Sequence, residues 1–451
     1  MLTPPVSQLS RLAIGLGLAT LSLAATASEL NVTTFDDQYD GLCDTHCSLR
    51  DAISVGASQA QTVIRLAAGT YRLSRRNLET PEGGRIDEDA NALGDFDVRG
   101  SLTILGGGTE QTIIDGDWID RLFEVAPQAS LSLNQLSLIN GFTPYYGGGL
   151  ENHGTALLEQ VAIKGSSARA ISESETEGAV GRGGGIANFG SLSLRRSLLF
   201  NNTAIGAYGY SGDGGGIYNL GALWVRDSQI NQNHCSDTGD AGNGGGLYNR
   251  GTADLARVAL IGNTVEFNGQ GGAIANLQGT LKLVNATLSA NSSGENSDGA
   301  VTNGYRRAQG TRAYAELYNV TIADNWGHGV ANWDQLLIRN SIVAGNQVYD
   351  EARNCVNQGL MQVKGLLLGT GAGNCVGSVS IDNASTLTQH LFPLADNNGS
   401  QVHALRSHSA ALDSALGNCP AHDQRQLDRP RDGDGDGQAR CDLGAFERAR
   451  P

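Results

Sequence analysis

The chain has 451 residues and a formal net charge of −15, with 62 glycines. This length allows several globular domains or one long solenoid. The negative charge and the lack of a long basic run argue against nucleic acid as a partner. The glycines recur together with a strand pattern, so collagen and disorder are poor interpretations of the composition.

Residues 1–27 have the features of a secretory signal peptide. Arg11 precedes the apolar run Leu12–Ala25, and Ala25-Thr26-Ala27 fits an A-x-A cleavage site. The alternative is an N-terminal membrane anchor, but the run is short for one. We therefore expect a secreted or cell-surface protein whose mature chain has no transmembrane segment.

Residues 28–60 are predicted to cap the N-terminal end of the fold. Glu29–Phe35 has a strand pattern, and Ser48-Leu49-Arg50-Asp51 fits a capping box that opens a short helix through about Val55. A helix at this place would cover the open end of a stack of strands.

Residues 61–347 are predicted to form one repetitive body. A phrase recurs there, consisting of two or three glycines, an aliphatic residue, any residue and Asn. Each period holds about three short strands, as in a parallel β-helix, whereas a propeller blade needs four strands in about 40 to 45 residues. The sequence thus predicts an all-β, right-handed parallel β-helix of about ten turns. The copies start 27 to 36 residues apart, at Gly147, Gly183, Gly214, Gly244 and Gly271 and, in weaker form, at Asp298 and Gly327.

Asparagines recur in two columns within these repeats. A side-chain amide can bond to the turn above and the turn below, and such a ladder satisfies amides that would be costly to bury alone. We expect each column to form a continuous ladder. The first column holds Asn152, Asn188, Asn219, Asn249, Asn276, Asn303 and Asn332, and the second holds Asn202, Asn233, Asn263, Asn291, Asn325 and Asn346.

Residues 348–451 lose the period and are predicted to form closing turns and an irregular, cross-linked C-terminal cap. The chain has seven cysteines, and export permits disulfides. Local pairing would leave Cys235 alone, although sequence does not fix the connectivity, and the rival zinc site lacks a C-x-x-C pair. The cysteines expected in disulfides are Cys43, Cys47, Cys355, Cys375, Cys419 and Cys441.

Two segments outside the repeats resemble a known family. Cys47-Ser48-Leu49-Arg50-Asp51-Ala52 is similar to the CSLREA motif of secreted bacterial β-helix proteins, with Asp51 where that family has Glu. The run from Asp423 through Arg429-Pro430 to Cys441–Glu447 resembles the ending of choice-of-anchor Q proteins. The resemblance implies export and a pectin-lyase-like parallel β-helix, and it implies little about activity.

Strand alternation indicates which side chains face away from the coil. The residue before each Asn of the first column should point outward, which stacks Tyr218 on Tyr248 about 5 Å apart. With the column that precedes the glycines, these side chains would form a polar strip edged by aromatic rings, which suits sugars. The alternative is that the tyrosines only stabilise the sheet. The expected ligand-binding residues are Glu151, Tyr218, Tyr248, Asn243 and Trp326.

Two pairs of residues are candidates for catalysis. Asp298 and His328 replace glycines on adjacent turns, and a carboxylate beside an imidazole can transfer protons. Gly327-His328-Gly329 also resembles a tripeptide of polygalacturonases, but the paired aspartates of that family are missing before it. A pectate-lyase-like site would place calcium-binding carboxylates near an arginine base, and the nearest candidates are Asp213, Asp240 and Arg182. A degenerate repeat is the alternative for Asp298 and His328.

An acidic loop near the C-terminus is a candidate metal site. Asp432, Asp434 and Asp436 alternate with glycines, and hard carboxylate oxygens on a flexible loop suit Ca²⁺. The EF-hand pattern fails because Leu443 stands at its twelfth position. A solvated acidic loop without a metal is the alternative.

These features support three hypotheses for function. The first is a non-catalytic protein that binds a polysaccharide or a cell-surface glycan along its strand face. The second is a lyase or glycoside hydrolase that acts on an acidic polysaccharide with the candidate acid–base residues. The third is a structural surface stalk or adhesin.

Overall fold

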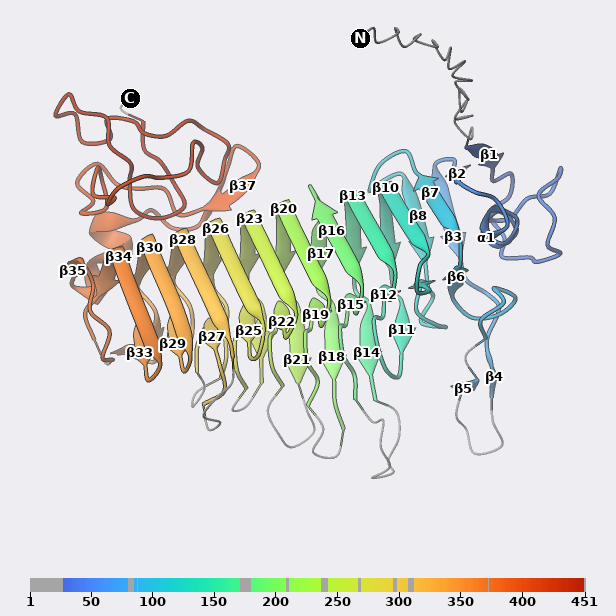
Figure 1. The fold of residues 1–451 in the computed structure, drawn as a ribbon, viewed down its shortest axis with the longest axis horizontal. Coiled ribbons are helices and arrows are strands. Elements are labelled where there is room, and N and C mark those ends of the chain that lie inside the picture. The colour runs from blue at the N-terminus through green and yellow to red at the C-terminus, as the bar shows by residue number, and fades with distance from the viewer. Residues whose placement is uncertain are drawn as a thin grey trace, which may run out of the picture.

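The computed structural model describes residues 27–79, 85–86, 88–170, 180–207, 211–236, 242–266, 269–294, 298–306, 312–371 and 373–449. The predicted signal peptide lies outside these ranges except for Ala27. Within them the chain coils as a right-handed parallel β-helix, as the sequence predicts, and its strands stack side by side along one long axis (Figure 1).

Three parallel sheets form the walls of the coil in the described residues. The sixteen-stranded sheet contains β1 (Ser28–Asn31), β2 (Thr62–Arg65), β3 (Gly69–Arg72), β7 (Ser101–Leu105), β8 (Thr112–Asp115), β10 (Ser130–Ile139), β13 (Thr155–Lys164), β16 (Ser191–Arg195), β17 (Leu198–Phe200), β20 (Ala222–Asn231), β23 (Thr252–Ile261), β26 (Thr280–Ser289), β28 (Tyr314–Ala323), β30 (Gln335–Ala344), β34 (Leu360–Gly369) and β35 (Val379–Ile381). The ten-stranded sheet contains β6 (Phe96–Val98), β9 (Phe123–Val125), β12 (Leu150–Asn152), β15 (Ile186–Asn188), β19 (Ile217–Asn219), β22 (Leu247–Asn249), β25 (Ile274–Asn276), β27 (Val301–Asn303), β29 (Val330–Asn332) and β33 (Cys355–Asn357). The five-stranded sheet contains β11 (Phe142–Thr143), β14 (Ser167–Arg169), β18 (Thr203–Ile205), β21 (His234–Ser236) and β24 (Thr264–Val265).

The two consecutive short strands that the sequence predicts in each repeat join into one bent ten-residue strand in most turns. The bend lies at the sixth residue, which takes left-handed backbone geometry with φ between 45° and 55°, except at Gly365 of β34, where φ is 79°. Asparagine tolerates this geometry better than most residues. The residues at the bend are Gln135, Gln160, Arg196, Asp227, Arg257, Asn285, Asn319 and Asn340.

Both predicted asparagine ladders are present. In the first, each Nδ2 donates to the Oδ1 of the next turn at 2.7 or 2.8 Å from Asn152 through Asn332, and the ladder ends at Asn357. In the second, the side chains from Asn202 through Asn346 are linked in the same way at 2.8 to 3.0 Å. Because each amide is buried yet paired, the ladders fix the register of the turns.

A helix closes the N-terminal end of the coil. Helix α1 (Leu49–Ala57) begins with the predicted capping box between Ser48 and Asp51 and runs two residues beyond the predicted end. Arg50, in the first turn of this helix, is buried. It pairs with Asp37 at 2.7 Å and donates to the carbonyl of Asp95 at 2.9 Å. The arginine of the CSLREA-like motif thus holds the segment that enters the first strand of the ten-stranded sheet.

The C-terminal residues fold back against the outer face of the sixteen-stranded sheet (Figure 1). Bend residues of that sheet bind this cap, since Asn285 donates to the carbonyl of His422 at 2.8 Å. Short elements in and before the cap are the hairpin β31 (Gln347–Val348) with β32 (Glu351–Ala352), the hairpin β36 (Ala395–Asn397) with β37 (Ser400–Val402), a 3-10 turn at Asn383–Ser385 and a π-helical turn at Thr386–His390. A further hairpin, β4 (Leu78–Glu79) with β5 (Arg85–Ile86), lies near the N-terminal end.

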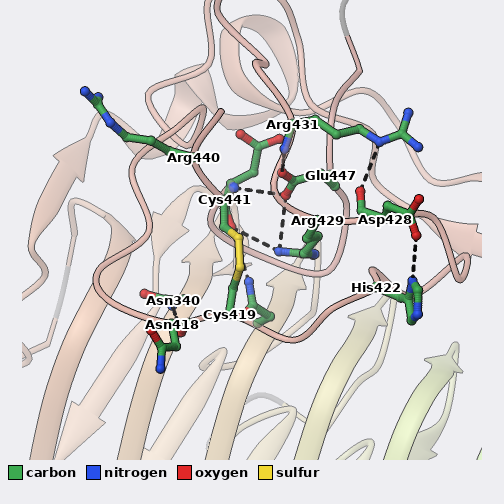
Figure 2. The surroundings of a disulfide bond; sticks show 12 residues. Asn340, Asn418, Cys419, His422, Asp428, Arg429, Arg431, Arg440, Cys441 and Glu447 are labelled. Carbon is green, nitrogen blue, oxygen red and sulfur yellow. Dashed lines mark hydrogen bonds and ion pairs between the residues drawn. A yellow bond between two sulfur atoms is a disulfide. The ribbon is translucent and has the colours of Figure 1, made fainter. Parts of the chain in front are cut away.

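The cap has its own polar core. Buried Arg429 donates to the carbonyl of Gly444 at 2.8 Å and lies 3.4 Å from a carboxylate oxygen of Glu447, beside the disulfide Cys419–Cys441 (Figure 2). Arg429, Cys441 and Glu447 belong to the segment for which the sequence predicts a resemblance to choice-of-anchor Q proteins. The other disulfides are Cys43–Cys47 and Cys355–Cys375, and Cys235 is a buried free thiol.

No helix among the described residues combines the length and the apolar character that crossing a membrane requires.

Candidate functional site

The outer face of the ten-stranded sheet carries one line of outward-pointing residues. The strand register places one residue from each turn in this line, because the middle residue of each three-residue strand faces away from the coil. In order along the axis the line reads Asp97, Glu124, Glu151, Ala187, Tyr218, Tyr248, Ala275, Thr302, Ala331 and Val356. It is therefore acidic over its first three turns and aromatic in the middle.

One buried guanidinium organises the acidic turns. Arg121 lies 2.6 Å from Asp95, 2.9 Å from Glu124 and also contacts Glu151. Three carboxylates thus surround a single arginine in a largely buried setting, and buried Asp97 stands one turn from Glu124 in the same line. Such a concentration of like charge is unfavourable for folding and is typical of functional sites.

Two pKa shifts follow from this arrangement. Burial, assisted by the neighbouring Asp95 and Glu124, raises the pKa of Asp97 to about 8. The hydrogen bond to Glu151, followed by its charge, raises the pKa of His153 above its ordinary value. Asp97 therefore keeps its proton near neutral pH, and the contact with Glu151 stabilises the charged form of the His153 imidazole.

His153 is fixed on two sides. Its Nε2 lies 2.9 Å from Oε1 of Glu151, and its ring stacks on Phe189 with centroids 4.7 Å apart and planes inclined by 4°. Its side chain keeps 34% of its surface exposed, against 10% for Glu151. Phe189 in turn meets Tyr146 edge-on at 5.3 Å. The partly exposed residues at this place are Glu124, Tyr146, His153, Arg182 and Phe189, and we name them the polar–aromatic strip.

The predicted tyrosine stack forms, but it is not a surface. Tyr218 and Tyr248 stack with centroids 5.0 Å apart and an interplanar angle of 13°. The expectation that they face solvent is wrong, because their exposed fractions are only 3% and 4%. Side chains of Tyr146, Phe189 and Tyr305 pack against the stack. The tyrosines therefore form the floor beneath the strip.

A second polar line borders the stack, as the sequence predicts. Arg182, Asp213, Asn243 and Gln270 are bridged in order by backbone pairing. Arg182 lies 3.5 Å from Asp213, and Asn243 donates to Asp213 at 2.8 Å. Burial raises the pKa of Asp213 to about 6. Arg182 and Asp213 are thus together, and their mutual pairing is equally suited to a structural role.

Asp298 lies at the far end of this line. Its carboxylate accepts a hydrogen bond from Gln270 at 2.6 Å and lies 3.7 Å from Arg306, and burial raises its pKa. His328 is on the next turn, where its carbonyl accepts from the amide of Ala300. The side chains found around the Asp298 carboxylate are thus Gln270, Arg306 and Trp333, and a proton-transfer pair with His328 stays a prediction.

Trp326 does not join the column that precedes the glycines. It pairs with Ser292 and Gln347, in continuation of β24, and its ring meets Tyr349 edge-on at 5.1 Å. The expectation that it edges the same strip as Asn243 is therefore wrong. The reason is that no insertion separates Asn325 from Gly327, so Trp326 belongs to the preceding wall of the coil.

The acidic loop of the cap contributes to a group of carboxylates that could bind a metal, and this group differs from the predicted one by one residue. Carboxylate oxygens of Asp413, Asp432 and Asp434 lie within 4.8 Å of one another. Asp436 is not part of this group, and its Oδ1 accepts instead from the amide of Gln438 at 2.7 Å. Three hard oxygen donors fit a Ca²⁺ or a similar cation. Sequence reasoning missed Asp413 because it lies 19 residues before Asp432.

Sequence reasoning also missed the acidic turns apart from Glu151. Asp97 and Glu124 precede the first glycine repeat, so the repeat pattern does not mark them. A weaker signal does exist, because Phe-Asp-Val at 96–98 and Phe-Glu-Val at 123–125 precede Leu-Glu-Asn at 150–152 at constant spacings of 27 residues. That spacing equals the shortest repeat in the body of the coil.

No protein-family model matches the chain, and no curated protein matches it significantly. Among solved structures it is similar to the A-module of Azotobacter vinelandii mannuronan C-5 epimerase AlgE6, with 15% identity, a TM-score of 0.32 and coverage of 78% of this chain and 97% of that chain. It is also similar to the A-module of the AlgE4 epimerase of the same organism, with 13% identity, a TM-score of 0.26 and coverage of 78% of this chain and 99% of that chain. A third similar structure is the PL6 family alginate lyase AlyGC, with 12% identity, a TM-score of 0.35 and coverage of 87% of this chain and 58% of that chain. The resemblance to CSLREA and choice-of-anchor Q proteins stays a prediction.

Proposed function

We propose that this is an exported protein that binds a glycan along the polar–aromatic strip on the outer face of the ten-stranded sheet. The observation that carries the proposal is the flat His153–Phe189 stack, which lies next to carboxylates and a guanidinium and keeps part of its surface in solvent. Sugars bind through the apolar faces of their rings and through hydroxyl groups that need donors and acceptors.

The strip meets both needs within a few turns. Phe189 and Tyr146 supply apolar ring surface, while Glu124 accepts and Arg182 donates hydrogen bonds. The buried tyrosine stack beneath gives these side chains a rigid floor. A preformed surface binds with a smaller loss of conformational entropy than a mobile one.

Binding is tested by retention on immobilised glycans. The panel contains cellulose, xylan, chitin, chitosan, polygalacturonate and alginate. We expect retention on at least one polymer and a loss of about tenfold or more in affinity for Phe189→Ala, because stacking on one ring contributes roughly 1–3 kcal/mol. Trp224→Ala is the matched control, since Trp224 is 40% exposed on β20 of the sixteen-stranded sheet.

Two outcomes contradict the proposal. Retention that Phe189→Ala leaves unchanged would place the glycan elsewhere. A lack of retention on the whole panel would leave the structural stalk as the better hypothesis.

A lyase that acts on an acidic polysaccharide through Arg182 and Asp213 is the remaining alternative, and unsaturated uronate ends absorbing in the ultraviolet would reveal it.

A structural Ca²⁺ in the cap is a further part of this proposal. The support is the group formed by Asp413, Asp432 and Asp434. Such an ion would join the glycine-rich loop to the rest of the cap near Cys441, away from the strip. Its expected role is therefore stability and not glycan recognition.

A further inference from the structure

We infer that His153, Glu151 and Glu124 form a proton-transfer site that hydrolyses glycosidic bonds in a neutral or amino-substituted glycan. This inference rests on the proposed glycan binding, and it assigns a reaction to one place on the strip. His153 and Glu124 are the catalytic residues, and Glu151 is a positioning residue.

The first argument is the way in which His153 is held. Glu151 fixes Nε2 at 2.9 Å, and the parallel ring of Phe189 fixes the plane of the imidazole. Glu151 is itself held by Arg121. A base or acid oriented by a carboxylate, which is oriented in turn by a third group, is the arrangement found in proton-transfer sites. A simple surface ion pair needs neither constraint.

The second argument is the position of Glu124. The strand register places it one turn from Glu151, which corresponds to roughly 4.8 Å between backbones. Arg121 contacts both carboxylates, so their side chains share one face. The side chain of Glu124 is 22% exposed, so an acid and a carboxylate base reach solvent side by side. Hydrolysis of a glycosidic bond needs a proton donor and a group that activates water near the anomeric carbon, and these two residues supply both functions.

The third argument is the sign of the local charge, which selects the reaction. Three carboxylates, on Asp95, Glu124 and Glu151, pair with the cations of Arg121 and His153. At this place three carboxylates therefore oppose two cations. This field stabilises the positive charge that develops at the anomeric carbon during hydrolysis. It repels a uronate and the negative charge that develops during elimination, which disfavours an acidic polysaccharide as substrate.

The step balances with water as the only co-reactant. The His153 imidazolium gives its proton to the glycosidic oxygen, and the bond from that oxygen to the anomeric carbon breaks, releasing the leaving sugar as an alcohol. Water adds to the anomeric carbon and passes a proton to the Glu124 carboxylate. Proton exchange with solvent then restores both residues.

The test uses the full secreted chain and the glycan that it retains in the binding panel. We expect release of reducing ends from chitosan, chitin, xylan or cellulose, with little from polygalacturonate or alginate. His153→Gln and Glu124→Gln should each lower the rate at saturating glycan about 100-fold or more, beyond any loss of affinity that the binding assay measures. His234→Gln is the matched control, because His234 faces Glu266 at 3.5 Å on the five-stranded sheet.

Glu151→Gln gives a readout that a structural role would not move. The groups facing His153 are Glu151, Glu124 and Arg121, and the bond to Glu151 is the main reason that its pKa is raised. Activity should fall as pH rises and His153 loses its proton. In Glu151→Gln this fall should move to lower pH, whereas a variant that is merely less stable would keep the midpoint.

The outcomes separate this inference from the proposed function. Retention without release of reducing ends overturns the hydrolysis and leaves binding in place. Release that His153→Gln leaves unchanged, or release of unsaturated ends, also overturns it. Loss of all retention in the unmodified protein instead contradicts the proposed function itself.

Discussion

Nδ2 of Asn219 donates to Oδ1 of Asn249 at 2.7 Å on the next turn, and Asn249 makes the same bond to Asn276. Each amide is fully buried and also donates to a backbone carbonyl of the following turn. The ladder thereby locks successive turns in register. The outward residues one position earlier, Tyr218 and Tyr248, are stacked for that reason.

The ladder predicts a difference between its middle and its end. Asn249→Ala leaves a buried donor on Asn219 and a buried acceptor on Asn276, so it should lower the free energy of unfolding by about 2–5 kcal/mol. Asn152→Ala should cost less, because Oδ1 of Asn152 has no hydrogen-bond partner within the described residues. Urea denaturation of both variants measures the difference. Equal losses would mean that the ladder bonds do not contribute as pairs.

A corner glycine predicts a second difference. Gly214 has φ of 69°, and a Cβ there would lie 2.3 Å from the carbonyl oxygen of Ile217. Gly399 has a similar φ of 77°, but a Cβ would meet no atom within 4 Å. Gly399→Ala should cost only the backbone strain of about 1–2 kcal/mol. Gly214→Ala should cost clearly more or prevent folding. Thermal unfolding of both proteins tests this, and a smaller cost at Gly214 would contradict the packed corner.

The pKa of Asp97 predicts how stability depends on pH. Its pKa of about 8 in the folded chain exceeds the ordinary value near 4 of an unfolded aspartate. Between pH 4 and pH 8 the folded state therefore binds more protons than the unfolded state. The contribution of Asp97 to the free energy of unfolding is complete at low pH and is lost as the pH rises to about 8. Asp97→Asn should flatten this decline, as urea denaturation between pH 4 and 8 would show. Asp436→Asn, at an exposed aspartate, is the control and should leave the slope unchanged.

The metal site in the cap predicts a selective response to calcium. Millimolar Ca²⁺ should raise the melting temperature, and a chelator should reverse the rise. Asp434→Asn should abolish the response because Asp434 belongs to the candidate group, whereas Asp436→Asn should retain it. Differential scanning calorimetry with Mg²⁺ as a comparison measures the effect. A response that Asp436→Asn also abolishes would favour the grouping expected from sequence alone.

The repeats made most of the fold predictable. Each Asn of the ladders stands at a fixed place after a glycine corner, so sequence alone aligned Asn219 with Asn249. Burial of the tyrosines was not predictable in the same way. The side chains that cover them are Phe189, Tyr146 and Tyr305. These three residues lie outside the recurring phrase, and aromatic residues do not recur at their places in every turn.

The candidate site was only half predictable for a related reason. Glu151 stands inside a repeat, but its partners Arg121 and Glu124 precede the repeats, and His153 follows the Asn that ends one. Asp413 joins the metal group through the fold of the cap, which has no period. Long-range contacts between non-repeating segments therefore account for what the sequence did not reveal.

Hydrogen–deuterium exchange with and without the retained glycan tests the central claim most directly. We expect added protection at residues 121–125, 150–153 and 186–190, which carry the acidic turns and the His153–Phe189 stack, with little change in the sixteen-stranded sheet or the cap. Protection confined to the cap or to the sixteen-stranded sheet would contradict a glycan site on the outer face of the ten-stranded sheet.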